Sequence, residues 1–434
     1  EGWNRFEALL GEQKYEAASA LAARMLEKAE EEENSIEWTR CLIRYASLRI
    51  SLHGYETAAR FLKEQPWPAD FMGSSVLNLF YAKSLVTYAQ QYSWEVNQRE
   101  KVDTKGTIDL KAWTRGEIYE EAKKSFEKVW GNRERLGAYS TREWKDFIVP
   151  NTYPEGIRPT LRDAVSYMWA EMLADTNGWR PDQFNGIYQL DLEELAGDSA
   201  EEISDRDSPA HPLGRICFIL ADLENWHRQE NNRDAALEAR LERYRYLYRN
   251  FTEASDRERL RSRLELHLDQ LRDIPWWAEG MAQLSEFIRE TNGPNSLQRA
   301  RETALSGESA YPESAGGRHC FAIVKQIEMP AYSLLGMRND NAQKRSLLIQ
   351  HKNLDRIYFR AYPIDLLETI ESSDDYNLLP AGGELQDLIA GSSPTHSWDI
   401  ALPPTPDYRI HKTYAVPPMA DSGTYLIVSS ARPG

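Results

Sequence analysis

The side chains that most often carry out chemistry are scattered along this chain. None of the eight histidines has another histidine or a cysteine at the spacing of a metal site. The three cysteines, Cys41, Cys217 and Cys320, are too few and too far apart for a disulfide framework or a zinc site. Cys41 and Cys217 lie in apolar helical runs, which predicts buried and inert thiols. No metal and no other cofactor is expected.

Short motifs that bind cofactors or activate nucleophiles do not occur in the sequence. It contains no glycine-rich dinucleotide fingerprint, phosphate-binding loop, paired-histidine zinc motif, calcium-binding loop or serine nucleophile elbow. Carboxylates are abundant, but acid–base catalysis needs a carboxylate whose pKa is shifted in a cleft. Sequence alone does not locate such a pair, and the four glutamates at 30–33 are interpreted as a solvated helix end. We therefore expect a protein that is not an enzyme.

Two neighbouring tryptophans are the candidate partner-binding residues. Trp276 and Trp277 lie in a segment with helical spacing, 275–290, and adjacent residues of a helix point about 100° apart. Because both rings cannot then face one core, we expect one of them to be exposed or to pack on another domain. Tryptophan is enriched at binding hot spots. The alternative is that both belong to the core, as most aromatic residues of a helical array do.

A mostly helical region must position these residues. Apolar residues recur at helical spacing over residues 1–305, and loops such as 66–68, with the sequence Pro-Trp-Pro, separate the helices. Paired amphipathic helices predict an α-solenoid, a helical array similar to tetratricopeptide repeats, with a subdivision near 150–210. An irregular helical domain without repeats is the alternative. The predicted helices cover 14–33, 36–52, 55–64, 71–98, 110–135, 158–174, 213–229, 234–251, 256–273, 275–290 and 294–305.

The pattern changes after residue 305. Residues 306–318 are rich in glycine, serine and proline, which predicts a linker with a hinge. Residues 319–434 contain short β-branched or alternating runs between turn residues, which predicts one antiparallel β-sandwich. A polar, partly helical insertion at 364–390 interrupts this domain. The seven predicted strands cover 320–327, 332–335, 345–351, 356–362, 398–402, 410–416 and 424–429.

The charge of the chain limits the partners that it can bind. Its formal net charge is -16. Binding to nucleic acid or to anionic lipid requires a basic face, so we expect neither. No stretch approaches the length of about 18 consecutive apolar residues that a membrane-spanning helix requires. The chain starts without methionine, a basic start or an apolar signal core, which is typical of a processed start.

Three segments are similar to parts of one protein family. Residues 351–362, with the sequence His-Lys-Asn-Leu-Asp-Arg-Ile-Tyr-Phe-Arg-Ala-Tyr, resemble the strand–turn–strand core of the first macroglobulin domain in bacterial alpha-2-macroglobulin-like proteins. Residues 398–402 and 423–430 resemble later strands of that domain, which commonly closes with a Gly-x-Tyr strand. Residues 158–163, with the sequence Arg-Pro-Thr-Leu-Arg-Asp, resemble a segment of the helical N-terminal extensions in this family.

The resemblance implies the N-terminal helical region and first macroglobulin-like domain of a bacterial alpha-2-macroglobulin homologue. Such proteins are secreted, periplasmic or membrane-anchored, and they are thought to trap proteases after cleavage of a bait segment. Implied partners are proteases, through the full-length protein, or other envelope proteins. The implied location is periplasmic or extracellular, with any anchor outside this chain. No bait region is recognisable, and residues 10–13, Leu-Gly-Glu-Gln, lack the cysteine of the family's thioester motif, so no catalytic residue is implied.

Two interpretations from other classes stay open at this point. A helical carbohydrate-active enzyme with an appended β-sandwich would leave no short motif, because its acid–base carboxylates lie far apart in sequence. Carboxylates and aromatic residues that converge in one deep pocket would favour that enzyme. A plain protein-binding adaptor, unrelated to macroglobulins, would keep the helical array without the seven-strand sandwich.

Overall fold

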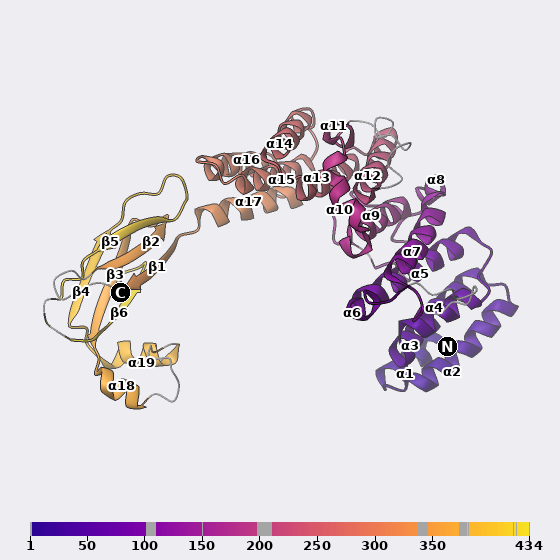
Figure 1. Cartoon of the computed structure of the whole chain (residues 1–434), viewed down its shortest axis with the longest axis horizontal. Coiled ribbons are helices and arrows are strands. Elements are labelled where there is room, and N and C mark those ends of the chain that lie inside the picture. Colours follow the sequence, from indigo (N-terminus) through magenta and orange to yellow (C-terminus); the bar gives the residue numbers. More distant parts are fainter. Residues whose placement is uncertain are drawn as a thin grey trace. The chain divides into compact units, whose positions relative to one another are not determined.

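The chain is helical over most of its length and ends in short antiparallel strands (Figure 1). This computed structural model describes residues 2–100, 110–149, 151–197, 211–336, 346–372, 380, 382–419, 421 and 423–433. The chain forms two compact units, Glu1–His267 and Leu268–Gly434. The expected order, helices first and strands last, is confirmed.

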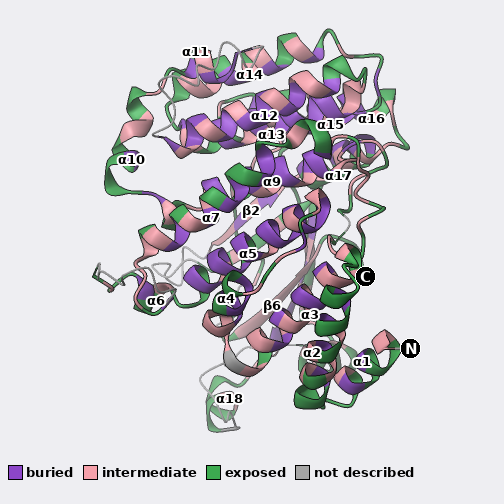
Figure 2. Cartoon of the chain, turned by 90° about the vertical axis from the view of Figure 1, so that its right-hand side faces the viewer, coloured by how far each residue is buried: buried purple, intermediate pink, exposed green. Residues whose placement is uncertain are grey.

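The first unit consists of helices that pack mainly against helices nearby in the sequence. The pairs α2 with α3, α5 with α7, α9 with α12 and α12 with α13 make the most extensive contacts within this unit. Buried residues, purple in Figure 2, form a stripe along α2 and α7 and cover most sides of α5, α9, α12 and α13. The helical elements of this unit are α1 (Gly2–Gly11), α2 (Tyr15–Glu31), α3 (Ser35–His53), α4 (Tyr55–Glu64), α5 (Phe71–Gln91), α6 (Ser93–Val96), α7 (Arg115–Trp130), α8 (Arg133–Leu136), α9 (Leu161–Ala174), η1 (Thr176–Gly178), α10 (Pro181–Gly186), η2 (Ile187–Gln189), α11 (Leu192–Leu195), α12 (Pro212–Gln229), α13 (Arg233–Asn250) and α14 (Ala254–Leu268), whose last residue belongs to the second unit.

Side chains that accept backbone hydrogen bonds set the starts of several helices. Asn34 Oδ1 accepts a hydrogen bond from the Glu37 backbone N at 3.3 Å at the start of α3. Thr160 and Asp163 form a reciprocal capping box at the start of α9. Such caps satisfy backbone N–H groups that have no partner inside the helix. The helices predicted at 36–52 and 158–174 therefore begin within three residues of α3 and α9.

A buried network of charged side chains joins α9, α12 and α13, and the sequence did not reveal it. Glu224 on α12 is 1% exposed and accepts hydrogen bonds from Arg240 Nε at 2.8 Å and Arg243 Nη2 at 3.1 Å, both on α13. Asp163 on α9 lies 2.8 Å from Nε2 of His227 on α12, and both side chains are buried. Buried charges persist only when they are paired and hydrogen-bonded. This network fixes how the three helices pack.

The second unit starts with three helices that contact one another. These are α15 (Trp277–Glu290), α16 (Ser296–Ala310) and α17 (Ala315–Glu328). The predicted linker at 306–318 is therefore wrong, because these residues include the end of α16 and the start of α17. Its glycines serve close packing, since a Cβ at Gly316 would lie 2.1 Å from the Glu279 backbone N on α15.

The strand predicted at 320–327 is also wrong, because this segment lies in α17. Ser314 caps the helix, its Oγ accepting a hydrogen bond from Gly317 N at 2.9 Å. The buried residues of α17 that follow are spaced by three or four positions, the period of a helix, and lie against α15 and α16. They are Cys320, Ile323, Val324 and Ile327.

Among the residues that the structure describes, six strands form two antiparallel three-stranded sheets, with the orders β1-β2-β5 and β4-β3-β6. They agree with the remaining six predicted strands within about two residues. The segment predicted as a partly helical insertion at 364–390 contains α18 (Leu366–Ser372) and α19 (Gly383–Gly391). The strands are β1 (Ala331–Gly336), β2 (Leu347–Lys352), β3 (Arg356–Pro363), β4 (His396–Ala401), β5 (His411–Ala415) and β6 (Tyr425–Ser430).

One apolar cluster contains residues of both sheets. Ile349 of β2 belongs to it together with Ile357 and Phe359 of β3, and all three are buried. The ring of Phe359 stacks on Trp398 of β4, with ring centroids 5.0 Å apart. Burial of apolar surface from both sheets stabilises them together, since two or three strands alone are marginal in water.

Hydrogen bonds brace the passage from α17 into the sheets. Lys352 Nζ and Asn353 Nδ2 both donate to the Ile327 carbonyl oxygen in the last turn of α17, at 2.9 and 3.1 Å. Arg409, from the loop before β5, donates to the Asn292 carbonyl oxygen between α15 and α16 at 2.9 Å. These contacts satisfy helix-end carbonyls that would otherwise need water.

His319 on α17 pairs with two glutamates of α15, and these pairs should make the packing of α17 on α15 dependent on pH. Glu279 and Glu286 of α15 lie 3.2 and 3.7 Å from its ring nitrogens and raise its pKa to about 10. In the unfolded chain the pKa of His319 is about 6.5, so below this pH the ion pairs contribute their full stabilisation to the folded state. As the pH rises through about 10, the folded ring loses its proton and this stabilisation is lost.

We therefore expect the melting temperature of the wild type to exceed that of His319→Gln at pH 6, and the difference to shrink towards pH 10. Circular dichroism melts of both proteins across this range measure it. A difference that stays constant with pH would show that His319 acts through packing alone.

Candidate functional site

The two tryptophans predicted to bind a partner are both buried. Trp276 is 5% exposed and Trp277 is 6% exposed, so exposure of one ring, the first of the two expected outcomes, does not occur. Trp276, the N-cap of α15, has helical backbone angles (φ -69°, ψ -12°), so the two rings still point in different directions, and the fold covers both. Trp277 contacts the ring of Tyr311, with centroids 6.4 Å apart. In this structure neither ring offers an exposed surface to a partner.

The thiols have the properties that their apolar surroundings predict. Cys41, Cys217 and Cys320 are free and buried. Burial raises the pKa of each of these thiols to about 12. Since the thiolate is the reactive form, none of the three is a nucleophile at neutral pH. The prediction of inert thiols for Cys41 and Cys217 is confirmed.

The histidines that the structure describes serve mainly as hydrogen-bonding partners. His227 contacts Asp163 in the helical core, and His411 Nε2 lies 2.9 Å from an oxygen of Asp407. Within the described ranges, no three or more His, Cys, Asp or Glu side chains gather closely enough to hold a metal ion. None of the described helices combines the length and apolar character needed to cross a bilayer.

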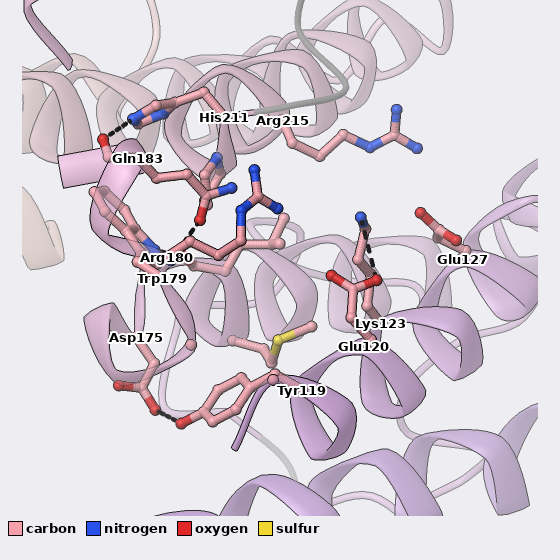
Figure 3. Close-up of a pocket in the computed structure, with 15 residues that line it drawn as sticks. Tyr119, Glu120, Lys123, Glu127, Asp175, Trp179, Arg180, Gln183, His211 and Arg215 are labelled. Carbon is pink, nitrogen blue, oxygen red and sulfur yellow. Dashed lines mark hydrogen bonds and ion pairs between the residues drawn. The ribbon is translucent and has the colours of Figure 1, made fainter. Parts of the chain in front are cut away.

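A cavity of about 520 Å³ lies in the first unit, between α7, α9, the turn through η1 and α10, and the start of α12 (Figure 3). This size is within the range of small-ligand sites, which is about 300–1,000 Å³. Its apolar part is formed by Met172 and Leu173 at the end of α9 and by Trp179. Trp179 is 3% exposed, and its Nε1 donates to the Leu173 carbonyl oxygen at 2.7 Å. The ring position is thus fixed from within the fold.

A tyrosine–carboxylate pair closes one end of the cavity. The hydroxyl group of Tyr119 on α7 donates a hydrogen bond to Asp175, which follows α9 (Figure 3). Asp175 also accepts from Gln90 Nε2 at 2.9 Å and from the backbone and side chain of Asn177. Burial by itself raises the pKa of Asp175, but these hydrogen bonds outweigh it and hold the pKa below the usual value. Asp175 is therefore an ionised, structural acceptor.

His211 holds the opposite end of the cavity. It is the N-cap of α12, and its Nδ1 accepts a hydrogen bond from Leu213 N at 3.1 Å. Nδ1 therefore carries no proton, and Nε2–H donates to the carbonyl oxygen of Gln183 on α10 at 2.8 Å. Burial lowers the pKa of His211, so its ring is neutral at pH 7. The residue ties α10 to α12.

Charged side chains of both signs line the walls. Glu120, Lys123 and Glu127 lie on one face of α7, because positions three, four and seven apart share a face. Arg180 and Arg215 come from two other elements, the N-cap of α10 and α12. The wall formed by α7 is therefore net negative, and the two arginines place positive charge on other walls (Figure 3).

Both arginines are held in place by neighbours. Arg180 binds Asp182 through Nε at 3.2 Å and Nη2 at 3.1 Å, and this hydrogen-bonded pair raises the pKa of the arginine. The guanidinium carbon of Arg215 lies 5.0 Å from the ring centroid of Trp169 and 5.5 Å from that of Trp130. Such cation–π contacts fix the direction of a guanidinium group. Arg215 is therefore fixed from within the fold, while Arg180, whose side chain is 57% exposed, is oriented by a surface pair with Asp182.

This arrangement suits binding better than acid–base catalysis. Glu120 and Glu127 rise from a single helix, about 10 Å apart along its axis at 1.5 Å per residue. In most glycoside hydrolases two carboxylates flank the bond that breaks. Asp175 is saturated with donors, and burial, together with its bond to Asp175, raises the pKa of Tyr119 and disfavours a tyrosinate.

The sequence did not single out the residues of this cavity. They are spread from Gly116 to Arg215 and come from five separate elements. Two local signals were available: the turn at 175–178, Asp-Thr-Asn-Gly, and His211 directly before Pro212, which marks a helix start. Neither signal indicates which helix faces lie opposite one another.

Comparison with protein-family models, with curated proteins and with solved structures finds no match to this chain. The function of the site is therefore inferred from the residues and contacts of this chain alone.

Proposed function

We propose that this chain is the non-catalytic N-terminal part of a bacterial cell-envelope protein of the alpha-2-macroglobulin type. In this proposal the helical region is an α-solenoid that positions the protease trap or recruits a partner. The C-terminal strands are a macroglobulin-type β-sandwich. The location is periplasmic or extracellular, and the partners are proteases, through the longer protein, or other envelope proteins.

The observation that carries the proposal is the arrangement of the second unit. Two antiparallel three-stranded sheets contribute to one apolar cluster, directly after a helical region. The segments quoted for the macroglobulin resemblance coincide with strands: residues 351–362 span the end of β2 and most of β3, and residues 423–430 contain β6. The α-solenoid is supported by helices that pack on their sequence neighbours.

The proposed role without catalysis is supported by the chemistry of the cavity in the first unit. Glu120 and Glu127 lie on one wall, and Asp175 is engaged by Tyr119 and Gln90. These features suit a recognition site. A carbohydrate-active enzyme would need two carboxylates across a cleft.

The test uses the intact longer protein that the proposal implies, mixed with a panel of endoproteases. We expect the protease to lose activity on a large protein substrate and to keep activity on a small peptide substrate after mixing. Equal loss or equal retention on both substrates would contradict the trap. The chain itself, assayed on peptide and glycan substrates, should show no turnover, and enzyme-like rates would favour the carbohydrate-active alternative.

A further inference from the structure

We propose that the cavity between α7, α9, α10 and α12 binds the C-terminal end of a peptide that finishes with a large apolar residue. This inference rests on the proposed binding role of the helical unit and names the chemistry of the partner. The ligand has three parts, an apolar side chain, a terminal carboxylate and backbone N–H groups, and the cavity offers a matching group for each.

The apolar side chain has a preformed place. Met172 and Leu173 are buried on α9, and Trp179 is held by its hydrogen bond to the Leu173 carbonyl oxygen. Gly116 adds no side chain to the lining, and a Cβ there would meet nothing within 4 Å, whereas Gly178 packs directly against the Tyr119 ring. Burying one large apolar side chain contributes about 1.5–3 kcal/mol, and a rigid site reduces the entropy lost on binding.

The terminal carboxylate has the Arg180 guanidinium group as its partner, and Arg215 adds a second positive charge to the lining. Asp182 occupies Nε and Nη2 of Arg180, so that Nη1 on the other edge keeps its donors for a ligand. Arg215 lines the same cavity with its guanidinium group held over Trp169. Arginine matches a planar carboxylate with two parallel hydrogen bonds.

The charge of the α7 wall favours the carboxylate of a peptide C-terminus over more highly charged anions. Glu120 and Glu127 flank Lys123 and leave this wall net negative. A doubly charged phosphate would be repelled there, whereas backbone N–H groups donate readily to carboxylates. A single carboxylate next to N–H donors is the chemistry of a peptide C-terminus. The charges of the cavity are therefore complementary to this ligand.

The direct test measures fluorescence anisotropy of the whole chain with an N-terminally labelled peptide, Gly-Ser-Gly-Ser-Phe. We expect the free acid to bind at least about tenfold more tightly than the same peptide with a C-terminal amide, because the amide removes the charge that the arginines recognise. A peptide that ends in Ser should bind at least as weakly as the amide. Equal binding of acid and amide would overturn the proposal.

Variants at the cavity locate the site. A Cβ at Gly116 meets nothing within 4 Å, so Gly116→Leu should fold normally and occupy the cavity, abolishing binding, while Gly116→Ala retains it. Arg180→Gln should weaken binding about tenfold. Lys124→Gln is the matched control, since Lys124 is exposed on α7 outside the cavity. Melting curves of each variant confirm that it is folded.

Two further outcomes separate the ligand sources and the two proposals. Free phenylalanine added as a competitor should displace the peptide poorly, and displacement at equal concentration would mean that the cavity takes a free amino acid, which contradicts a peptide ligand. Peptide binding is measured on this chain and trapping on the longer protein. Failure of one measurement therefore does not imply failure of the other.

Discussion

Replacing Glu224 by leucine is expected to lower the free energy of unfolding of the helical unit by about 3–5 kcal/mol. The carboxylate accepts hydrogen bonds from Arg240 and Arg243, which are 1% and 0% exposed. Without it, two guanidinium charges remain buried between α12 and α13. Arg228 also pairs with Glu224, but this side chain is exposed and can turn to water. The expected loss is a large share of the stability of a typical domain.

Urea unfolding followed by far-UV circular dichroism measures this effect. Glu265→Leu is the control, because Glu265 is exposed on α14 in the same unit, and it should change stability by less than about 0.5 kcal/mol. Adding Arg240→Met and Arg243→Met to Glu224→Leu should recover more than half of the loss, since apolar residues of similar volume often replace a buried ion network without cost. A loss below about 1 kcal/mol for Glu224→Leu alone would contradict the importance of the network.

The second large effect is expected at Gly316, where α17 touches the backbone of α15. A Cβ there would lie 2.1 Å from the Glu279 backbone N and 2.6 Å from the Ala278 carbonyl carbon. Backbone atoms cannot turn aside as a side chain can, so the two helices have to separate. We expect Gly316→Ala to lower the free energy of unfolding of the second unit by about 3 kcal/mol, the upper end for overpacked cores.

The matched control for this variant is Gly383→Ala in α19 of the same unit. A Cβ at Gly383 meets nothing within 4 Å, and alanine favours a helix over glycine by up to about 1 kcal/mol. Gly383→Ala should therefore be neutral or slightly stabilising in thermal melts. A wild-type melting temperature for Gly316→Ala would show that α15 and α17 are packed less closely than the structure has them.

Most elements of the fold could be predicted because their signals are local. The helix at 55–64 was predicted with the bounds that α4 has, since a glycine before it and prolines after it limit the apolar stripe. Strand β3 was predicted at 356–362 because alternating residues fit a half-buried strand. Period and turn residues depend only on neighbours along the chain, so the sequence alone carries them.

The segment 306–327 was mispredicted because two local signals conflicted. Glycine, serine and proline suggested a linker, and the β-branched residues after Cys320 suggested a strand. The spacing of Cys320, Ile323, Val324 and Ile327 indicated a helix, and burial against α15 and α16 decided in its favour. Glycine here serves the close approach of two helices, which is a tertiary property that composition does not reveal.

The candidate site could not be predicted for a different reason. Tyr119 and Asp175, or Gln183 and His211, meet only because α7, α9, α10 and α12 pack in one arrangement. That arrangement depends partly on buried charges such as Glu224 on α12, and charged residues are normally assigned to the surface. A search of the sequence for motifs therefore passes over the whole cavity.

The burial of all three cysteines has a practical consequence for measuring motion in this protein. With the pKa of each thiol raised to about 12, maleimide dyes at neutral pH should leave Cys41, Cys217 and Cys320 unlabelled in the folded chain. A cysteine introduced at exposed Lys124 or Glu265 then reacts alone. A second cysteine at an exposed position of the second unit, such as Gly383, would then allow single-molecule energy transfer to follow the distance between the two units while the native cysteines stay in place.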